Sequence, residues 1–400
     1  MRKGHTFKRC CRCGATAGSR RCESCGGAVF SWTFIVDVAP AGYPRRQVKK
    51  GGYATRADAV EAMHRIQLEK LDGTFIEPSR ITTGEYLTNW VEAISGQGAI
   101  RATTAKTYEV AVRVHVVPRL GRVPLQELTR KLIRELYATL RARGRARGHG
   151  SLSVKSVHNV HLAFHRALED AIDDGLLRSN PATRAHRVSP PRHEIRCWSP
   201  SELHHFLAVV EHDPNFALWR LAAFSGMRRG ELLGLRWRDI DLDGSVVRVQ
   251  RQLIRNGTAV GFGEPKTRAG RRSIFLDCAT IAALRAHRAS QDDLQRAMGN
   301  RYRAELDLVF AARDGRPRDP DAVTHQFVRR AMREGLPRIR FHDLRHTHAS
   351  IALGAAVHPK VVQERLGHAS VKLTLDTYAH VIPPMHAHAA MQIAAMVDAG

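Results

Sequence analysis

The sequence Arg-Phe-His-Asp-Leu-Arg-His-Thr-His occupies residues 340–348, and the organisation of the chain is easiest to follow from it. Its His342 and Arg345 stand three positions apart, so on a helix both side chains project from one side. If that helix borders a cleft, both can contact one anion, and we expect a site for a phosphate-sized group here. For the neighbouring His346 and His348 we expect supporting roles in the core rather than metal binding.

Two further features follow toward the C-terminus. The sequence Arg-Leu-Gly-His ends at His368, and Tyr378 stands ten residues later. A tyrosine hydroxyl has a pKa of about 10, which makes it a poor nucleophile without cationic and hydrogen-bonding neighbours. The arginines and histidines of the two preceding motifs can supply such neighbours. Tyr378 is therefore a candidate nucleophile.

A third motif, Phe-Ser-Gly-Met-Arg-Arg-Gly-Glu-Leu-Leu-Gly-Leu-Arg-Trp, lies upstream at residues 224–237. Together with residues 341–347, Leu-Gly-His at 366–368 and Tyr378, it resembles the signature of tyrosine recombinases of the phage integrase type. In that family the first catalytic arginine follows Gly-Met and precedes a glutamate by three positions. The resemblance therefore selects Arg228 over Arg229 and makes Glu231 a supporting acid. The catalytic set that it implies is Arg228, Lys266, His342, Arg345, His368 and Tyr378.

The resemblance implies DNA strand transfer by transesterification. The Tyr378 hydroxyl would attack a phosphodiester, forming a 3′-phosphotyrosyl bond and freeing a 5′ hydroxyl that later attacks a partner strand. The two arginines would stabilise the transition-state charge, and the histidines would donate hydrogen bonds, with His342 also able to take part in proton transfer. Lys266, in a Pro-Lys-Thr turn, would protonate the leaving 5′ oxygen. Because the bond energy stays in the phosphotyrosine, this chemistry implies no ATP, no catalytic metal and no other catalytic cofactor.

The composition favours a nucleic-acid partner. The 400 residues carry a formal net charge of +25, which favours binding to a polyanion through counterion release. DNA is the leading partner, and an anionic membrane surface is the weaker alternative. The sequence contains neither a long apolar run of transmembrane length nor a cleavable leader. We expect a cytoplasmic, nucleoid-associated bacterial protein with no membrane partner.

Five of the seven cysteines fall between positions 10 and 25. They include two Cys-x-x-Cys pairs, a spacing that allows four thiolates to surround zinc. We expect a structural zinc site formed by Cys10, Cys13, Cys22 and Cys25, with Cys11 as a spare. The spacer between the pairs is shorter than in common zinc ribbons, so a basic leader with incidental cysteines remains the alternative for residues 1–28.

The next two segments predict two small domains. Residues 29–38 alternate as a strand, residues 45–50 indicate a second strand, and Thr55 is a plausible N-cap for a helix that stops at Gly73. The small sheet with one helix, residues 29–75, resembles the arm-type DNA-binding domain of phage integrases, and residues 1–60 carry a net charge of +9. Residues 79–185 show four helical stripes, the second predicted over Thr104–Val117 and stopped by Pro118. They resemble the helical, SAM-like core-binding domain of integrases.

Residues 194–395 form the predicted catalytic domain, of α+β type. A helix should begin after Ser199, because Pro200 and Glu202 suit its first turn. Residues 246–250, 263–268 and 271–276 are expected to form a small antiparallel sheet, and residues 385–397 a terminal helix. The chain as a whole is therefore expected to be multidomain and mainly α, with small β-sheets.

The sequence thus predicts a site-specific DNA recombinase that integrates and excises a phage or another mobile element. Its expected partners are double-stranded attachment sites, three further copies of itself in a homotetramer on DNA, a directionality factor and a host DNA-bending protein. Two rival functions remain open. A non-catalytic, zinc-containing DNA regulator would explain the charge and the cysteines, and a tyrosine-type topoisomerase would share the chemistry.

Overall fold

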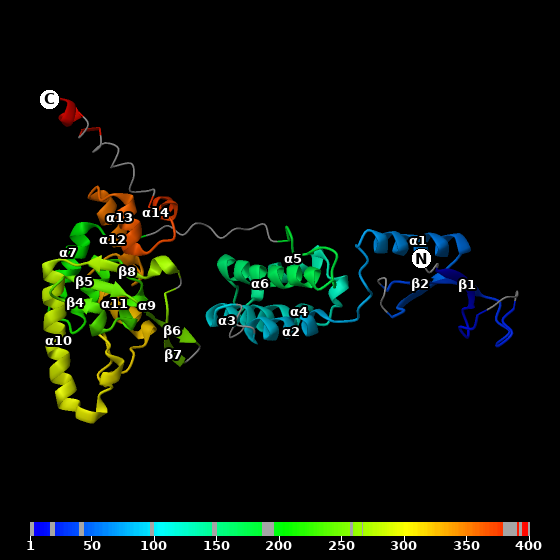
Figure 1. Ribbon diagram of the computed structural model, residues 1–400, viewed down its shortest axis with the longest axis horizontal. Helices are drawn as coiled ribbons and strands as arrows, with labels where there is room; N and C mark the ends of the chain where they lie inside the picture. Colours follow the sequence, from blue (N-terminus) through cyan, green and yellow to red (C-terminus); the bar gives the residue numbers. More distant parts are fainter. Residues whose placement is uncertain are drawn as a thin grey trace. The chain divides into compact units, whose positions relative to one another are not determined.

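The computed structural model describes residues 4–16, 21–39, 44–96, 100–145, 150–185, 196–256, 259–265, 267–378, 390–391 and 394–398. Contacts divide the chain into two compact units, residues 1–191 and 192–400, and each is described by itself. Both are built mainly from helices with small antiparallel sheets, as expected (Figure 1). Within the described residues, no helix is both long and apolar enough to cross a membrane.

The first unit begins with a three-stranded antiparallel sheet in the order β1-β2-β3, covered by one helix. Its elements are β1 (His5–Cys10), β2 (Phe30–Asp37), β3 (Gln47–Tyr53) and α1 (Arg56–Leu71). The expected strands and helix are confirmed, and Thr55 caps α1 by accepting a hydrogen bond from the Asp58 amide at 3.1 Å. Strand β1 was not expected, because its polar residues show no apolar alternation. It extends the sheet into the cysteine-rich segment.

The remainder of the first unit is a helical bundle. Figure 1 shows α5 and α6 lying along α2 to α4. The bundle consists of α2 (Thr83–Gly96), α3 (Ala102–Val110), η1 (Ala111–Val116), α4 (Val117–Leu120), the 3₁₀ turn η2 (Leu125–Glu127), α5 (Arg130–Arg143) and α6 (Val154–Asp173). The expected stripe on α6 is buried, with Phe164 and Leu168 at the centre of the core.

The prediction that Pro118 stops the second helix of this bundle was wrong. The helix continues from α3 through the π-helical stretch η1 into α4, and Pro118 is the second residue of α4. Proline lacks an N–H group and clashes with the carbonyl of the preceding turn in a regular α-helix. The wider π-helical turn changes the hydrogen-bonding partners before the proline. The axis can therefore continue to Leu120.

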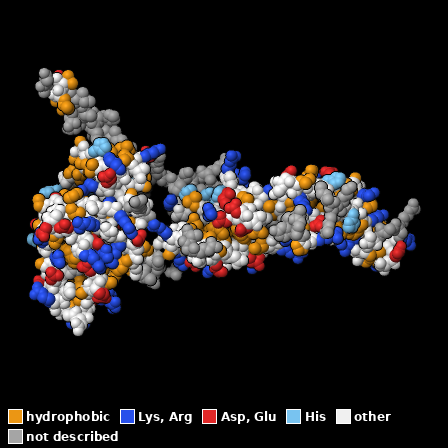
Figure 2. Space-filling view, viewed as in Figure 1, with side chains coloured by type: hydrophobic (Ala, Val, Ile, Leu, Met, Phe, Trp, Pro, Cys, Tyr) orange, Lys and Arg blue, Asp and Glu red, His pale blue; other side chains and the backbone are white. Residues whose placement is uncertain are grey.

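The second unit combines eight longer helices, in its described part, with a three-stranded sheet and a hairpin. The helices are α7 (Pro200–Val209), α8 (Phe216–Ser225), α9 (Arg229–Gly234), α10 (Cys278–Met298), α11 (Pro320–Arg333), α12 (Asp343–Gly354), α13 (Pro359–Leu366) and α14 (Val371–Thr377). Short 3₁₀ turns lie at Trp237–Asp239, Arg268–Gly270, Gly299–Arg301 and Ala304–Leu306. Helices α12, α13 and α14 gather at one end of the unit (Figure 1). Lys and Arg side chains are distributed over its visible face, with acidic and hydrophobic side chains among them (Figure 2).

The sheet of the second unit differs in part from the expectation. Its order is β4-β5-β8, from β4 (Ile240–Asp241), β5 (Val246–Val249) and β8 (Arg272–Phe275), and β6 (Gln252–Asn256) pairs separately with β7 (Ala259–Gly263). The predicted strand at 263–268 was wrong: β7 ends at Gly263 and a 3₁₀ turn begins at Arg268. Pro265 has no N–H to donate to a ladder, which prevents a central strand there.

An aromatic cluster positions the start of α12. The Phe327 ring packs against Trp198, Phe206, Trp219 and Phe341 at centroid distances of 5.4 to 5.8 Å. Phe341 directly precedes His342, so this cluster fixes the entry into the helix that carries the predicted site. The Trp198 amide also donates to the Thr347 hydroxyl of α12 at 3.1 Å.

We expect Phe164→Ala to destabilise the helical bundle by about 3 to 5 kcal/mol, because truncation of a fully buried phenylalanine leaves a cavity. Thermal melting of the full chain, followed by circular dichroism, should show an earlier transition. Leu162→Ala on the same helix is the matched control, since Leu162 is 50% exposed and Phe164 is 0% exposed. Equal effects of the two substitutions would contradict this assignment of the core.

Candidate active site

The structure brings five of the six predicted catalytic residues together in the second unit, and Lys266 lies outside the described residues. Arg228 precedes α9, His342 precedes α12, and Arg345 lies in the first turn of α12. His368 follows α13, and Tyr378 follows α14. Hydrogen bonds connect these segments, as the following paragraphs describe.

A buried carboxylate holds two arginines. Glu231 is 1% exposed and accepts hydrogen bonds from Arg228 Nη1 at 2.7 Å and from Arg272 Nη2 at 2.9 Å. Burial alone would raise the pKa of this carboxyl, but the adjacent Arg272 and Arg228 guanidinium groups more than offset it, so the pKa is lowered. Arg228 also donates to the Gly367 carbonyl at 3.2 Å. Glu231 thus orients the predicted catalytic arginine, and Arg272 is a member of the site that the sequence did not reveal.

Arg345 is a buried cation with incomplete hydrogen bonding. It is 3% exposed, and its Nη1 donates to the Gly226 carbonyl at 2.6 Å. Its Nη2 is buried without a hydrogen-bond partner among the described residues. Burial, together with the charge of Arg228, lowers the pKa of Arg345 to about 9. A buried donor of this kind is costly unless an acceptor binds it, so the site favours an anion.

Gly226 allows this close packing. It has a φ of +63°, and a Cβ there would lie 2.8 Å from both the His348 ring and Leu366. Only glycine adopts this backbone conformation without strain and leaves room for both neighbours. The Gly-Met sequence before Arg228 therefore has a steric cause.

Two histidines border the same site in neutral form. Burial, followed by the charges of neighbouring residues, lowers the pKa of His342 and of His368 to about 4. His368 Nδ1 lies 2.9 Å from the Thr374 hydroxyl of α14. At neutral pH these rings can exchange hydrogen bonds with an anion without adding two further charges to a cluster of arginines.

Tyr378 directly follows α14 and is buried. It is 1% exposed and packs with Ala349, Leu353, Val362 and Leu366. Burial raises the pKa of its hydroxyl, although the Arg345 charge acts in the opposite direction. Its hydroxyl oxygen lies 2.8 Å from His346 Nδ1. The sequence did not predict this contact, although the spacing of four residues from His342 places both histidines on one side of α12.

The two remaining residues of the motifs have other partners. Arg229 donates to the Pro320 carbonyl at 2.9 Å and to the Thr324 hydroxyl at 2.7 Å, both on α11. His348 Nδ1 lies 3.0 Å from the Ala223 carbonyl. His348 therefore has the core position expected from the sequence, and Arg229 serves the packing of α9 on α11.

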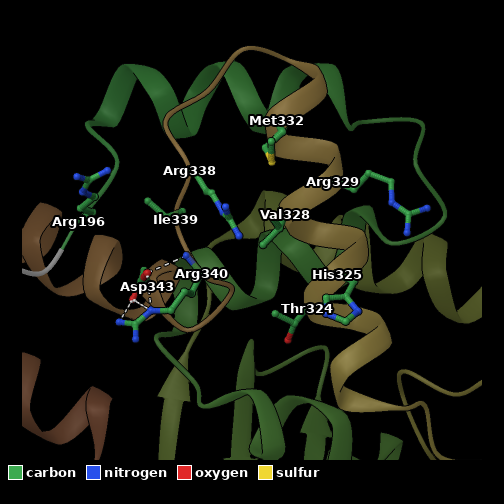
Figure 3. A pocket seen from close by; sticks show the side chains of 10 residues that line it. All are labelled: Arg196, Thr324, His325, Val328, Arg329, Met332, Arg338, Ile339, Arg340 and Asp343. Carbon is green, nitrogen blue, oxygen red and sulfur yellow. Dashed lines mark hydrogen bonds and ion pairs between the residues drawn. The ribbon is translucent and has the colours of Figure 1, made fainter. Parts of the chain in front are cut away.

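A basic cavity of about 940 Å³ adjoins the start of α12. Figure 3 shows Arg329 and His325 on α11, Arg196 before α7, and Arg338 on the segment that leads into α12. Arg340 is paired with Asp343, whereas the other three arginines form no ion pair within the described part of the chain. The cavity therefore presents uncompensated positive charge next to the site.

The four predicted cysteine ligands of the first unit also come together. Their sulfur atoms all lie within 4.8 Å of one another, with Cys10 and Cys25 at 3.6 Å and Cys13 and Cys22 at 3.4 Å. Tetrahedral coordination with Zn–S bonds of about 2.3 Å would place sulfur atoms about 3.8 Å apart. The cluster could therefore hold a metal ion. Cys11 is exposed and outside the cluster.

Comparison with known proteins places this geometry in a family. Residues 200–383 match the model of the phage integrase family. A prophage phiRv2 integrase of Mycobacterium tuberculosis is 30% identical over 298 residues, covering 74% of each chain. A XerC-like tyrosine recombinase of Caldanaerobacter subterraneus is 27% identical over 361 residues, covering 86% of this chain and 90% of the relative.

Solved structures show the same fold. The integrase of the transposon Tn1549, in complex with transposon right-end DNA, matches 74% of this chain and 94% of its own, with a TM-score of 0.62 and 22% identity. A lambda integrase dimer bound to a core site matches 82% of this chain and 89% of its own, with a TM-score of 0.54 and 19% identity. With these relatives, the chain belongs to the phage integrase family of tyrosine recombinases.

Proposed function

We propose that this tyrosine recombinase cuts and rejoins DNA with Tyr378 as its nucleophile. The observation that carries this assignment is the position of the Tyr378 hydroxyl near Arg345, whose buried Nη2 has no hydrogen-bond partner among the described residues. A DNA phosphate would complete the hydrogen bonding of that arginine. Because Tyr378 is almost fully buried in the free protein, DNA binding has to open a path to the hydroxyl.

The remaining site residues take roles that their contacts support. Arg228, oriented by Glu231, would join Arg345 on the non-bridging phosphate oxygens and stabilise the transition state. The neutral His342 and His368 would donate hydrogen bonds to the same phosphate. For Lys266 we propose, from its place in the sequence alone, protonation of the leaving 5′ oxygen.

We further propose that the chain integrates and excises a mobile element. Its relatives include the phiRv2 prophage integrase of Mycobacterium tuberculosis, the integrase of Mycobacterium phage D29 and the ICEBs1 integrase of Bacillus subtilis. Residues 29–75 would bind arm-type sites. Residues 79–185 and the catalytic domain, residues 194–395, would both bind the core site. The net charge of +25 supports extended DNA contact. A homotetramer on paired attachment sites, a directionality factor and a host DNA-bending protein complete the proposed assembly.

The nucleophile is tested by trapping on a nicked DNA that carries the element's attachment site. We expect the intact protein to form a covalent adduct and Tyr378→Phe to form none, because the substitution removes only the attacking oxygen. Denaturing electrophoresis detects the adduct, and a mobility shift under the same conditions shows that the variant still binds DNA.

Two outcomes would replace this function by a rival. Tight DNA binding by the intact protein without any adduct, at several salt concentrations, would favour a non-catalytic regulator. Relaxation of a supercoiled plasmid that lacks an attachment site would favour a topoisomerase. Recombination of paired attachment sites is expected of an integrase alone.

The basic cavity beside α12 is proposed to hold the DNA backbone. Arg196, Arg329 and Arg338 form no ion pair with other described residues and offer three charged donors. Arg338 stands on the segment that leads directly to His342. Backbone contacts of this kind fix the register of the duplex without reading bases. A phosphate held here would help to position the scissile phosphate next to Tyr378.

We expect Arg338→Ala to weaken DNA binding several-fold and to lower the slope of log affinity against log salt by about one, because one phosphate contact is lost. Titration at several salt concentrations measures both. Arg296→Ala is the matched control, since Arg296 is exposed on α10 and is paired with Asp293. An equal effect of the two substitutions would contradict the assignment.

We propose zinc as the metal of the cysteine cluster. Four thiolates at tetrahedral distances suit zinc better than hard cations such as Mg²⁺ or Ca²⁺. The ion would connect two turns, one from Cys10 to Gly14 and one from Cys22 to Gly26. In each turn the final glycine has a positive φ and donates its amide to the carbonyl of the first cysteine. The role is structural, since no open coordination position remains.

Metal analysis of the purified chain should find about one zinc per molecule. Cys22→Ser should lose this zinc, because it removes one of four ligands, and Cys11→Ser should retain it, because Cys11 lies outside the cluster. Loss of zinc from both variants, or from neither, would be inconsistent with the proposed ligand set.

A further inference from the structure

His346 contacts the hydroxyl oxygen of Tyr378, but it has no role in the catalytic steps proposed above. His346 Nδ1 lies 2.8 Å from the Tyr378 hydroxyl, and the two rings are 5.7 Å apart between centroids. When the hydroxyl attacks phosphorus, its proton has to leave. A protein group already in contact with the oxygen is suited to accept that proton.

His342 has a different position. Its ring packs edge-on against His346, with centroids 5.4 Å apart and an angle of 88° between the rings. His342 reaches the surface at the N-terminal end of α12, where a phosphate would arrive, whereas His346 lies one turn further along the helix. The two histidines are therefore suited to different partners, His342 to the phosphate and His346 to the tyrosine.

The position of His346 is fixed from both sides along the chain. The preceding Arg345 is anchored to the Gly226 carbonyl at 2.6 Å, and the following Thr347 accepts a hydrogen bond from the Trp198 amide at 3.1 Å. Both anchors come from parts of the chain more than 100 residues away. Such preorganisation is what a proton acceptor needs, because transfer depends on a short, well-aligned hydrogen bond.

We propose that His346 is the catalytic residue that accepts the proton of Tyr378 during cleavage. The proposal rests on Tyr378 being the nucleophile. As the Oη–P bond forms and the P–O5′ bond breaks, the Tyr378 proton passes to His346 Nδ1, giving an imidazolium, while the departing 5′ oxygen takes a proton from a separate donor. In rejoining, the 5′ hydroxyl attacks the phosphotyrosine, and the imidazolium returns the proton to the departing tyrosine oxygen.

Electrostatics links this transfer to DNA binding. The bound phosphate adds negative charge to the site and favours the cationic ring.

The test compares two DNA substrates, one with a normal scissile phosphate and one with a sulfur in place of the bridging 5′ oxygen. A thiolate can leave without being protonated. The sulfur substrate should therefore restore the cleavage rate of a variant that lacks the proton donor to the leaving group. It should not restore the rate of a variant that lacks the proton acceptor of the tyrosine. We expect His346→Ala to slow adduct formation at least about 100-fold on both substrates. The DNA affinity of this variant should remain within about three-fold of that of the intact chain, because a group that only accepts a proton contributes little to binding.

Two further readouts separate proton transfer from packing. Added imidazole should partly restore His346→Ala, and its rate should rise about tenfold per pH unit, because attack then depends on the small fraction of ionised tyrosine. His346→Asn places an amide near the Nδ1 position but cannot accept the proton, so it should remain slow. His205→Ala, which alters an exposed histidine of α7, should behave like the intact chain.

Several results would overturn the proposal. A normal rate for His346→Ala would do so, as would its recovery on the sulfur substrate, which would make His346 the donor to the leaving group. Full activity of His346→Asn would reduce its role to orientation, and imidazole rescue of His342→Ala alone would transfer the role to His342. An intact chain that forms no adduct would instead contradict the proposed function, so the two failures are distinguishable.

Discussion

The site depends on one buried carboxylate. Glu231 accepts hydrogen bonds from two guanidinium groups. Without it, Arg228, Arg272 and Arg345 would place three positive charges in one poorly solvated region with no carboxylate among them. Such a cluster would be expelled toward water or would lose its geometry. With one negative charge for three positive ones, the region keeps its packing and still carries an excess positive charge. The single carboxylate therefore makes the arginine cluster stable enough to stay buried, and the positive charge that it leaves over attracts phosphate.

Hydrogen bonds from these arginines to main-chain carbonyls connect segments that lie far apart in the sequence. Arg228 donates to the carbonyl of Gly367, Arg272 to that of Arg365, and Arg345 to that of Gly226. Each arginine of the site thus holds a turn that carries another part of the site. Two of these hydrogen bonds end on Arg365 and Gly367, so the turn that carries His368 is held directly by the arginines of the site.

The sequence predicted most of this architecture, because motif order and helical spacing determine which residue types can meet. It could not predict contacts that depend on packing between distant segments. Arg272 carries no local pattern that distinguishes it from other strand arginines, and the His346 contact requires knowledge of where α14 ends. Pro118 was misjudged because a π-helical turn compensates for it, and β1 was missed because a polar edge strand lacks alternation.

The pairing of β1 with β2 has a consequence for the protein before it meets DNA. Strand β1 ends at Cys10, and that residue faces Phe30 in the ladder, so a metal bound by the cysteines also fastens the last pair of the sheet. Strand β2 carries Trp32 and Phe34, and β1 covers one of its edges. If the cysteines bind a metal, its loss would loosen the end of β1 and leave that part of the β2 edge open to pairing with another chain. Metal binding and the solubility of the first unit would then be linked through one pair of strands.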